Sequence, residues 1–326
     1  MTELPQKYGA DYYRTLLSKQ GKRFYDGLNA QLLREDYSGR TVFSVSEPGS
    51  AASDCFAAYR ALRDDHPEYF YLGFRSEFAL QGNVGTLVYP ILYSPETIAR
   101  IRLQLRKRIY CFVRGTAALP MMEREILVYG RIAGKLDYKD NNDVRDHNIV
   151  GPVLTSSGVC EGYNALLLLC FRRIGIPCIK VYGRTKKDRL HCWTIAWING
   201  TPVHCDVTWD RTKRGVVRYD YFNLSDRQIA HDHHNFSGPS VPVCTSEAWN
   251  YYCYNRLCVN SFQELRTRIR SNLSEGRAPL LIHFSYCPGS GDCFKEFRRA
   301  LAAEQLRGTR KIYYHPELKN LAMLPA

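Results

Sequence analysis

The stretch Gly158-Val159-Cys160-Glu161-Gly162-Tyr163, with the run 164–174 behind it, decides the fold of this chain. Residues 165–171 are apolar on every side of a helix, which predicts that the helix is buried in the core. Gly175 favours the end of this helix, and Pro177 prevents its continuation. Cys160 would then open a buried helix, where free backbone N–H groups and the helix dipole favour a thiolate. Position alone leaves a reactive cysteine and a buried apolar one equally open.

Further along the chain, Asn199-Gly200 separates two segments of strand character, 190–198 and 201–208. This dipeptide predicts a two-residue hairpin turn, which places Asp206 diagonally across from His191 on one face of the sheet. Diagonal side chains of neighbouring strands are within reach, so the hairpin presents a base beside a carboxylate that can orient it. The opposite face is apolar and is expected to face the core, with Cys192, Ala196, Ile198, Val203, Cys205 and Val207.

The order Cys, His, Asp and the surrounding segments resemble the transglutaminase-like superfamily, most closely its bacterial transglutaminase-core members. The likeness rests on 158–163, on His191-Cys192-Trp193 and on His204-Cys205-Asp206-Val207-Thr208-Trp209-Asp210. It extends from Glu123 to His234. The resemblance implies an α+β fold with a papain/transglutaminase-like core, in which the buried helix that carries the cysteine packs against an antiparallel sheet.

The resemblance also implies roles for three residues. Cys160 would be the nucleophile, His191 the general base that later acts as acid, and Asp206 the group that holds the imidazole in place. The implied reaction is acyl transfer on an amide or peptide bond of a peptide or protein substrate, through a thioester and with no cofactor. Water as the acceptor would make the enzyme a peptidase or amidase, which is the expected activity. A lysine-type amine as the acceptor would make it a transamidase, which is the alternative.

Other residues near this triad are weaker candidates for the site. The backbone N–H of Cys160 is one expected oxyanion donor, and Asn148 is a candidate for the second. Glu161 is expected to cap the helix or to contact substrate. Trp193 and Trp209 are candidate walls of the core or of the substrate cleft.

Zinc is the rival interpretation of the repeated pairs His191-Cys192 and His204-Cys205. Neighbouring residues of a strand point to opposite faces, so these four side chains cannot converge on one ion. The run His231-Asp232-His233-His234 has a metal-binding composition, but its polar setting predicts a loop or helix end with hydrogen-bonding roles. We therefore expect no metal. Cys192 and Thr194 both depart from the family pattern. Because successive strand residues alternate between the two faces of a sheet, we expect both to point away from the triad.

The charge of the chain raises a second class of function. Its 326 residues include 45 Lys and Arg against 32 Asp and Glu, a net charge of +13, which would suit a non-catalytic basic module. The basic residues of 100–114 lie largely off the apolar stripe of a predicted helix and have no interleaved aromatic partners, so nucleic-acid binding is not expected. Basic loops at 184–189 and 211–218 would fit carboxylate-bearing substrates, or they are simply solvated.

Three regions follow from the periodic segments: a mostly helical region 1–93, a catalytic core 94–236 and a small α+β extension 237–326. The sequence shows no signal peptide and no membrane-spanning run, so we expect a cytoplasmic protein whose 12 cysteines are mostly reduced. The expected elements include helices at 11–27, 54–64, 261–270 and 294–305, a helix from 95, and strands at 84–93, 249–254 and 280–286.

Overall fold

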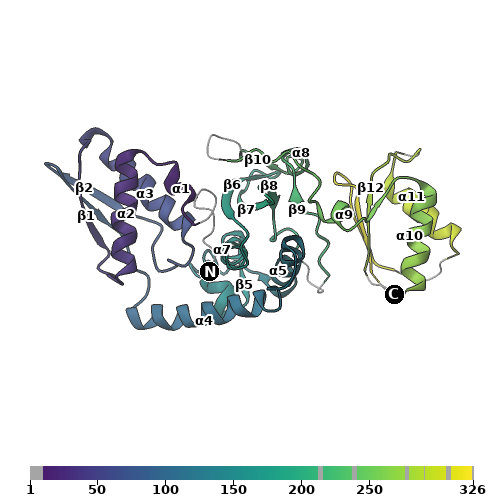
Figure 1. Cartoon of the computed structure of the whole chain (residues 1–326), viewed down its shortest axis with the longest axis horizontal. Coiled ribbons are helices and arrows are strands. Elements are labelled where there is room, and N and C mark those ends of the chain that lie inside the picture. The colour runs from purple at the N-terminus through teal and green to yellow at the C-terminus, as the bar shows by residue number, and fades with distance from the viewer. Residues whose placement is uncertain are drawn as a thin grey trace.

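The computed structural model describes residues 10–211, 216–236, 241–275, 279–289, 291–305 and 310–324. The described chain is an α+β structure, as the sequence predicts, with three larger sheets that follow one another along its long axis (Figure 1). Helix α4 (Pro95–Val113) runs along one side of the molecule, below the N-terminal and central sheets in this view.

The N-terminal region combines helices with a three-stranded sheet, in which the sequence indicated the strand at 84–93 but not its two partners. The predicted helix 11–27 is interrupted, because Ser18 caps a new helix by accepting a hydrogen bond from the Gly21 backbone N–H. Strand β1 alternates exposed and buried residues over five positions, a pattern too short to stand out in the sequence. The elements are α1 (Tyr12–Thr15), α2 (Lys19–Leu33), β1 (Arg40–Ser44), a 3-10 turn (Pro48–Ser50), α3 (Ala51–Asp65), β2 (Glu77–Gln81) and β3 (Val84–Val88), with antiparallel sheet order β1-β3-β2.

The central region is built around α7 (Cys160–Arg173), the helix that the sequence places in the core. Leu166, Leu167 and Phe171 are fully inaccessible to solvent. They belong to a hydrophobic cluster whose members run from Phe24 to Phe222, so one core joins the N-terminal and central regions. The remaining elements before the central sheet are α5 (Met121–Lys135), β4 (Asp137–Tyr138), α6 (Val150–Leu154) and β5 (Ser157–Gly158).

The central sheet confirms the predicted hairpin register. Ile198 pairs with Thr201 and Thr194 with Cys205, on either side of a turn in which Asn199 and Gly200 both have positive φ. The five strands have the order β10-β6-β7-β8-β9 and all pair antiparallel. Their bounds are β6 (Cys178–Thr185), β7 (Leu190–Ile198), β8 (Thr201–Cys205), β9 (Phe222–Leu224) and β10 (His233–His234).

The two faces of this sheet enter different cores, as the parity of the hairpin predicts. Ala196 and Ile198 pack in the cluster that contains α7, and Asn164 of that helix donates to the Thr194 hydroxyl at 3.0 Å. Trp193 and Ile195 point into a second cluster together with Ile229 of α8 (Asp226–Ile229). The register of one hairpin therefore decides which side chains reach the buried helix.

The C-terminal region has a four-stranded sheet of order β11-β12-β14-β13. The segment 249–254, predicted as a strand, instead contains the short helix α9 (Tyr251–Tyr254). This prediction was wrong because the Asn250 side chain accepts from the Tyr252 N–H and starts a helix despite the β propensity of the tyrosines. The other elements are β11 (Cys258–Val259), α10 (Phe262–Ser274), β12 (Leu280–Phe284), α11 (Cys293–Ala303), β13 (Ile312–His315) and β14 (Asn320–Met323).

The three region limits remain predictions. Among the described residues, no helix is both long and apolar enough to cross a lipid bilayer.

We expect Leu167→Ala to lower the free energy of unfolding by about 2–5 kcal/mol, because the truncation leaves a cavity in a closely packed cluster. Leu103→Ala in α4 is the control, since Leu103 is 51% exposed and its truncation should cost less than about 0.5 kcal/mol. Urea unfolding followed by circular dichroism measures both. Equal losses in the two variants would contradict the placement of α7 in the core.

Candidate active site

Cys160 is the first residue of α7, the position that the sequence predicts. The segment 145–152 closes around this end of the helix, and Gly162 permits the approach: a Cβ there would lie 3.0 Å from the backbone oxygens of Asp146 and Asn148. The N–H groups of the first turn have no partner inside the helix. They and the helix dipole therefore stabilise negative charge on the sulfur.

His191 and Asp206 meet as the hairpin geometry predicts. The Nε2 of His191, on β7, donates to Oδ2 of Asp206, which follows β8, at 2.7 Å. Because this bond occupies Nε2, Nδ1 is the ring nitrogen that can exchange a proton with the Cys160 thiol. The other carboxylate oxygen accepts from the backbone N–H groups of Thr208 at 2.9 Å and Trp209 at 3.3 Å. Asp206 is buried, so both of its oxygens are fixed by protein groups.

The three side chains perturb one another strongly. A hydrogen bond from the Cys192 thiol, against burial and with help from His191, lowers the pKa of Cys160 to about 4. Burial lowers the pKa of His191, but Asp206 and the Cys160 sulfur outweigh it and raise this pKa to about 10. Burial raises the pKa of Asp206, yet His191 and His233 hold it well below its ordinary value. At neutral pH the arrangement is thus thiolate, imidazolium and carboxylate.

Cys192 is closer to this chemistry than the sequence indicates. It is buried on the core-facing side of β7, as predicted, but its thiol donates to the Cys160 sulfur. This hydrogen bond, together with burial, raises the pKa of Cys192 well above its usual value. The expectation that Cys192 turns away from the triad is therefore wrong, because the start of α7 packs on the same face. Thr194 binds Asn164 instead and does stay apart from the triad.

Asp206 has a second histidine partner, whose position the sequence did not reveal. His233 donates through Nε2 to Oδ2 of Asp206 at 3.1 Å and through Nδ1 to Oδ1 of Asp232. Both ring nitrogens need a proton for these bonds, so His233 is an imidazolium. Burial opposes this charge, but the two carboxylates raise the pKa of His233 overall. Asp232 also accepts from the Tyr221 hydroxyl and lies 2.8 Å from Nε2 of His231.

The composition of residues 231–234 was the sequence signal for this network, and hydrogen-bonding roles were favoured there over a metal. Across the described residues, most imidazole nitrogens of the candidate metal clusters are engaged in hydrogen bonds, and Nε2 of His231 instead faces the Asp232 carboxylate at 2.8 Å. His204, for example, accepts from Trp193 at Nδ1 and donates to Asp226 at Nε2. A protonated ring nitrogen has no lone pair for a metal. These donor sets fit hydrogen bonding better than an ion: His191, Asp206 and His233; His204, Asp226 and Cys244; His231, Asp232 and His315.

A cleft of about 650 Å³ opens beside His191, a size that suits a peptide segment or small ligand. Trp209 lines this cleft, as one of its two predicted roles requires. Tyr138 lines it too, because β4 places it in register with Gly158, two residues before Cys160. No pattern in the sequence marks Tyr138, since only the pairing of β4 with β5 brings it here. His315 of the C-terminal region completes one wall.

Trp193 does not reach the cleft. Only 1% of it is exposed, and its Nε1 donates to Nδ1 of His204 at 2.9 Å. Its ring stacks on that of His191 with centroids 5.9 Å apart. Of its two predicted roles, Trp193 therefore takes the one in the core, behind the His191 imidazole, and does not contact the cleft.

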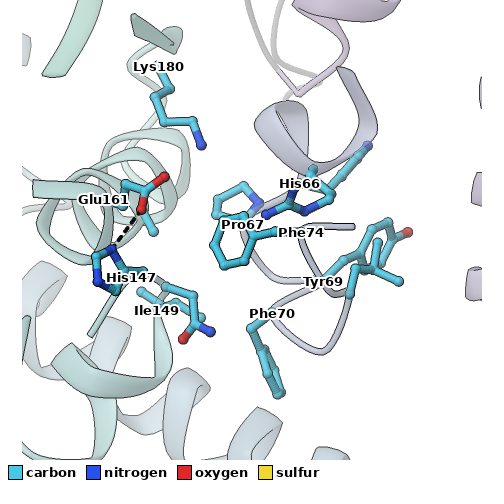
Figure 2. Close-up of a pocket in the computed structure, with 13 residues that line it drawn as sticks. His66, Pro67, Tyr69, Phe70, Phe74, His147, Ile149, Glu161 and Lys180 are labelled. Carbon is cyan, nitrogen blue, oxygen red and sulfur yellow. Dashed lines mark hydrogen bonds and ion pairs between the residues drawn. The ribbon is translucent and has the colours of Figure 1, made fainter. Parts of the chain in front are cut away.

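The two other predicted residues, Asn148 and Glu161, line a separate hollow of about 50 Å³ (Figure 2). Oε2 of Glu161 lies 3.2 Å from Nδ1 of His147, so this carboxylate pairs with a histidine instead of capping α7. Oδ1 of Asn148 accepts from the Val150 N–H. The volume suffices for a few water molecules. Neither residue lines the cleft at His191.

Comparison with known proteins agrees with this geometry. Residues 113–207, which contain Cys160, His191 and Asp206, match the family model of the transglutaminase-like superfamily. No curated protein matches the sequence. Two solved structures are similar over parts of the chain. One is described as a TGase, with 11% identity over 47% of this chain and 48% of that one and a TM-score of 0.32.

The other is a candidate cysteine protease from Cytophaga hutchinsonii, with 13% identity over 42% of this chain and 62% of that one and a TM-score of 0.28. This chain thus spans less than two thirds of either protein. The segment 113–207, which holds all three residues of the candidate triad, is thus similar to the transglutaminase-like superfamily.

Proposed function

We propose that this protein is a cysteine-dependent acyl-transfer enzyme that hydrolyses amide or peptide bonds through a thioester. The observation that carries the proposal is the buried His191–Asp206 hydrogen bond of 2.7 Å beside a thiol whose pKa is lowered to about 4. A thiolate that exists at neutral pH is a ready nucleophile, and a paired imidazolium is a ready acid.

The proposed reaction has two steps. In the first, the Cys160 thiolate attacks the carbonyl carbon, and the backbone N–H of Cys160 stabilises the oxyanion. The His191 imidazolium gives its proton to the nitrogen of the leaving amine, the C–N bond breaks and a thioester forms. In the second, neutral His191 takes a proton from water, and the resulting hydroxide attacks the thioester. The thiolate leaves, a carboxylic acid is released and the imidazolium is restored.

Charge at the cleft favours water over a lysine as the acyl acceptor. Lys186, Lys187, Arg189 and Arg211 line the cleft with His191. Their positive field disfavours the approach of a lysine ammonium group, whereas neutral water is unaffected. This is the physical reason to place hydrolysis ahead of transamidation.

We expect the purified protein to release carboxylic acid products from peptide or glutamine-donor libraries, and Cys160→Ala to lower kcat/KM at least about 10³-fold. Mass spectrometry with a primary amine present separates the outcomes, because hydrolysis adds water and transamidation adds the amine. Full activity of Cys160→Ala on a confirmed substrate would refute the mechanism. Amine incorporation in place of hydrolysis would make the enzyme a transamidase.

The pKa values predict how alkylation of Cys160 depends on pH. The thiolate persists above the lowered pKa of about 4, so iodoacetamide should label Cys160 quickly at pH 5–6. His191→Ala removes part of the stabilisation and should move the midpoint of labelling to higher pH. A hydrogen bond with the Cys253 thiol also lowers the pKa of Cys258, to about 6. The assay therefore uses a Cys258→Ser background and peptide mapping. Slow, equal labelling of all cysteines at pH 5–6 would contradict a thiolate at Cys160.

We further propose that His233 is a positioning residue for this reaction. Its imidazolium donates to the same carboxylate oxygen that His191 uses, at 3.1 Å, and is itself held by Asp232. The carboxylate of Asp206 therefore lies between two cations, which limits its rotation and keeps it ionised. A fixed carboxylate keeps the His191 ring aimed at the thiol.

His233→Gln should lower kcat by about ten- to a hundred-fold and KM little, because Asp206 loses one of its fixed partners. Removal of a nearby positive charge raises the pKa of every neighbour, so both limbs of the pH–rate profile should move up by about half a unit to one unit. The control is His234→Gln, whose partly exposed ring faces Asp188 at 3.5 Å. A purely structural role would reduce activity without moving either limb, and that result would overturn the assignment.

A further inference from the structure

We infer that the cleft beside His191 binds an acidic peptide segment, whose carboxylates pair with Lys186, Lys187, Arg189 and Arg211. The inference rests on the proposed function and names the class of substrate for the same site. All four cations line the cleft with the imidazole, although they come from two segments far apart in sequence.

The β6–β7 turn that carries Lys186, Lys187 and Arg189 is held in place by backbone contacts. The backbone N–H of Lys186 donates to the carbonyl oxygen of Asp232 at 2.7 Å, and that of Thr185 to the carbonyl oxygen of Arg189 at 2.9 Å. The three side chains are exposed, so they extend from a fixed turn into solvent at the cleft. A surface whose backbone is already ordered loses less entropy when it binds a ligand.

The four cations of the cleft have no fixed acidic partner in the described part of the chain. Within the described residues, none of Lys186, Lys187, Arg189 and Arg211 forms an ion pair. Some arginines elsewhere do form ion pairs, including Arg14, Arg102, Arg145, Arg218, Arg227, Arg266, Arg270 and Arg299. The charge of these four side chains is thus free to pair with a substrate in the cleft.

Arg211 adds a more specific observation. Its guanidinium lies over the ring of Tyr138, 4.6 Å from the centroid, and its Nε is buried without a hydrogen-bond partner among the described groups. A buried, unpartnered donor costs free energy until an acceptor arrives. Guanidinium groups match carboxylates in geometry, and removal from water strengthens the bond. Arg211 is therefore suited to receive a carboxylate in the cleft.

Few anions in the cleft wall compete for these cations. Asp232 is already bonded to His233, Tyr221 and His231. Glu317 is the other acidic group of the lining, and it lies 3.7 Å from Nδ1 of His315. The unpaired charge of the described lining is consequently positive. It would attract an acidic chain and speed the encounter of that chain with the site.

A peptide fits the wall better than a nucleic acid does. Binding of single strands relies on aromatic faces that are free to stack with bases. Trp209 instead packs on His233 at 4.5 Å, and Tyr138 is covered by Arg211. The thiol also acts on acyl groups, which a peptide supplies and a nucleic-acid backbone does not.

The test compares two charge reversals of equal size in a Cys160→Ala background, where binding is measured without turnover. Lys186→Glu/Lys187→Glu changes the cleft, and Arg106→Glu/Lys107→Glu changes exposed residues of α4. The probe is a fluorescent peptide rich in Glu and Asp, and fluorescence anisotropy gives Kd. We expect the cleft variant to weaken binding at least about tenfold and the control less than about twofold, with a strong dependence on salt. Circular dichroism checks that both variants fold.

A neutral peptide of the same length, with Gln and Asn in place of the acids, should bind at least about tenfold more weakly to the unreversed protein. Equal binding of the two peptides, or equal losses in the two reversed variants, would overturn the inference. An oligonucleotide that displaces the acidic peptide at lower concentration would assign the cleft to nucleic acid instead.

The outcome separates this inference from the proposed function. Turnover of neutral peptides at the same kcat/KM by the unreversed and cleft-reversed enzymes would reject the acidic substrate and leave the hydrolase. Selective binding of acidic peptide without any turnover by the native enzyme would keep the acidic ligand and reject the hydrolase.

Discussion

The buried carboxylate of Asp206 is the point on which the site depends. Its two oxygens accept four hydrogen bonds, two from backbone N–H groups and two from the imidazoles of His191 and His233. A buried carboxylate without partners would cost several kcal/mol or take up a proton. Full pairing keeps it charged, and the charge in turn fixes the protonation of both histidines. The thiol at the start of α7 then completes a set in which each charge has an opposite neighbour.

This alternation explains how so many ionisable groups share a small, dry volume. The charges alternate along the site. The Cys160 thiolate is negative, the His191 imidazolium positive and the Asp206 carboxylate negative. The His233 imidazolium is again positive and the Asp232 carboxylate negative. No step places like charges in direct contact, so each group offsets the burial cost of the next. The same order makes the site sensitive to single substitutions, because loss of one member leaves its neighbours buried and unpaired. Stability and reactivity of the site therefore rest on the same contacts.

The sequence predicted the parts of this site that follow from local rules. A helix apolar on all sides and an Asn-Gly turn suffice to place Cys160 at a helix start and His191 beside Asp206. The contact of Cys192 with Cys160 could not be predicted, because strand parity says which face a residue occupies and not where the partner helix begins. Tyr138 was missed since its neighbours come from the pairing of two-residue strands. Strands β1 and β2 and the helix α9 were missed because five-residue strands and one asparagine cap are weak signals.

The C-terminal extension is more than an addition to the core in this arrangement. The Tyr221 hydroxyl donates to Asp232 and lies 2.9 Å from Nε2 of His315, on β13. His315 also lines the cleft. One hydrogen-bonded path thus leads from the C-terminal sheet through Tyr221, Asp232 and His233 to the carboxylate that pairs with His191. Any ligand that contacts His315 in the cleft therefore touches a residue linked to the charge network of the site. If the proposed function holds, this path links the cleft wall at His315 to the positioning of the His191 imidazole.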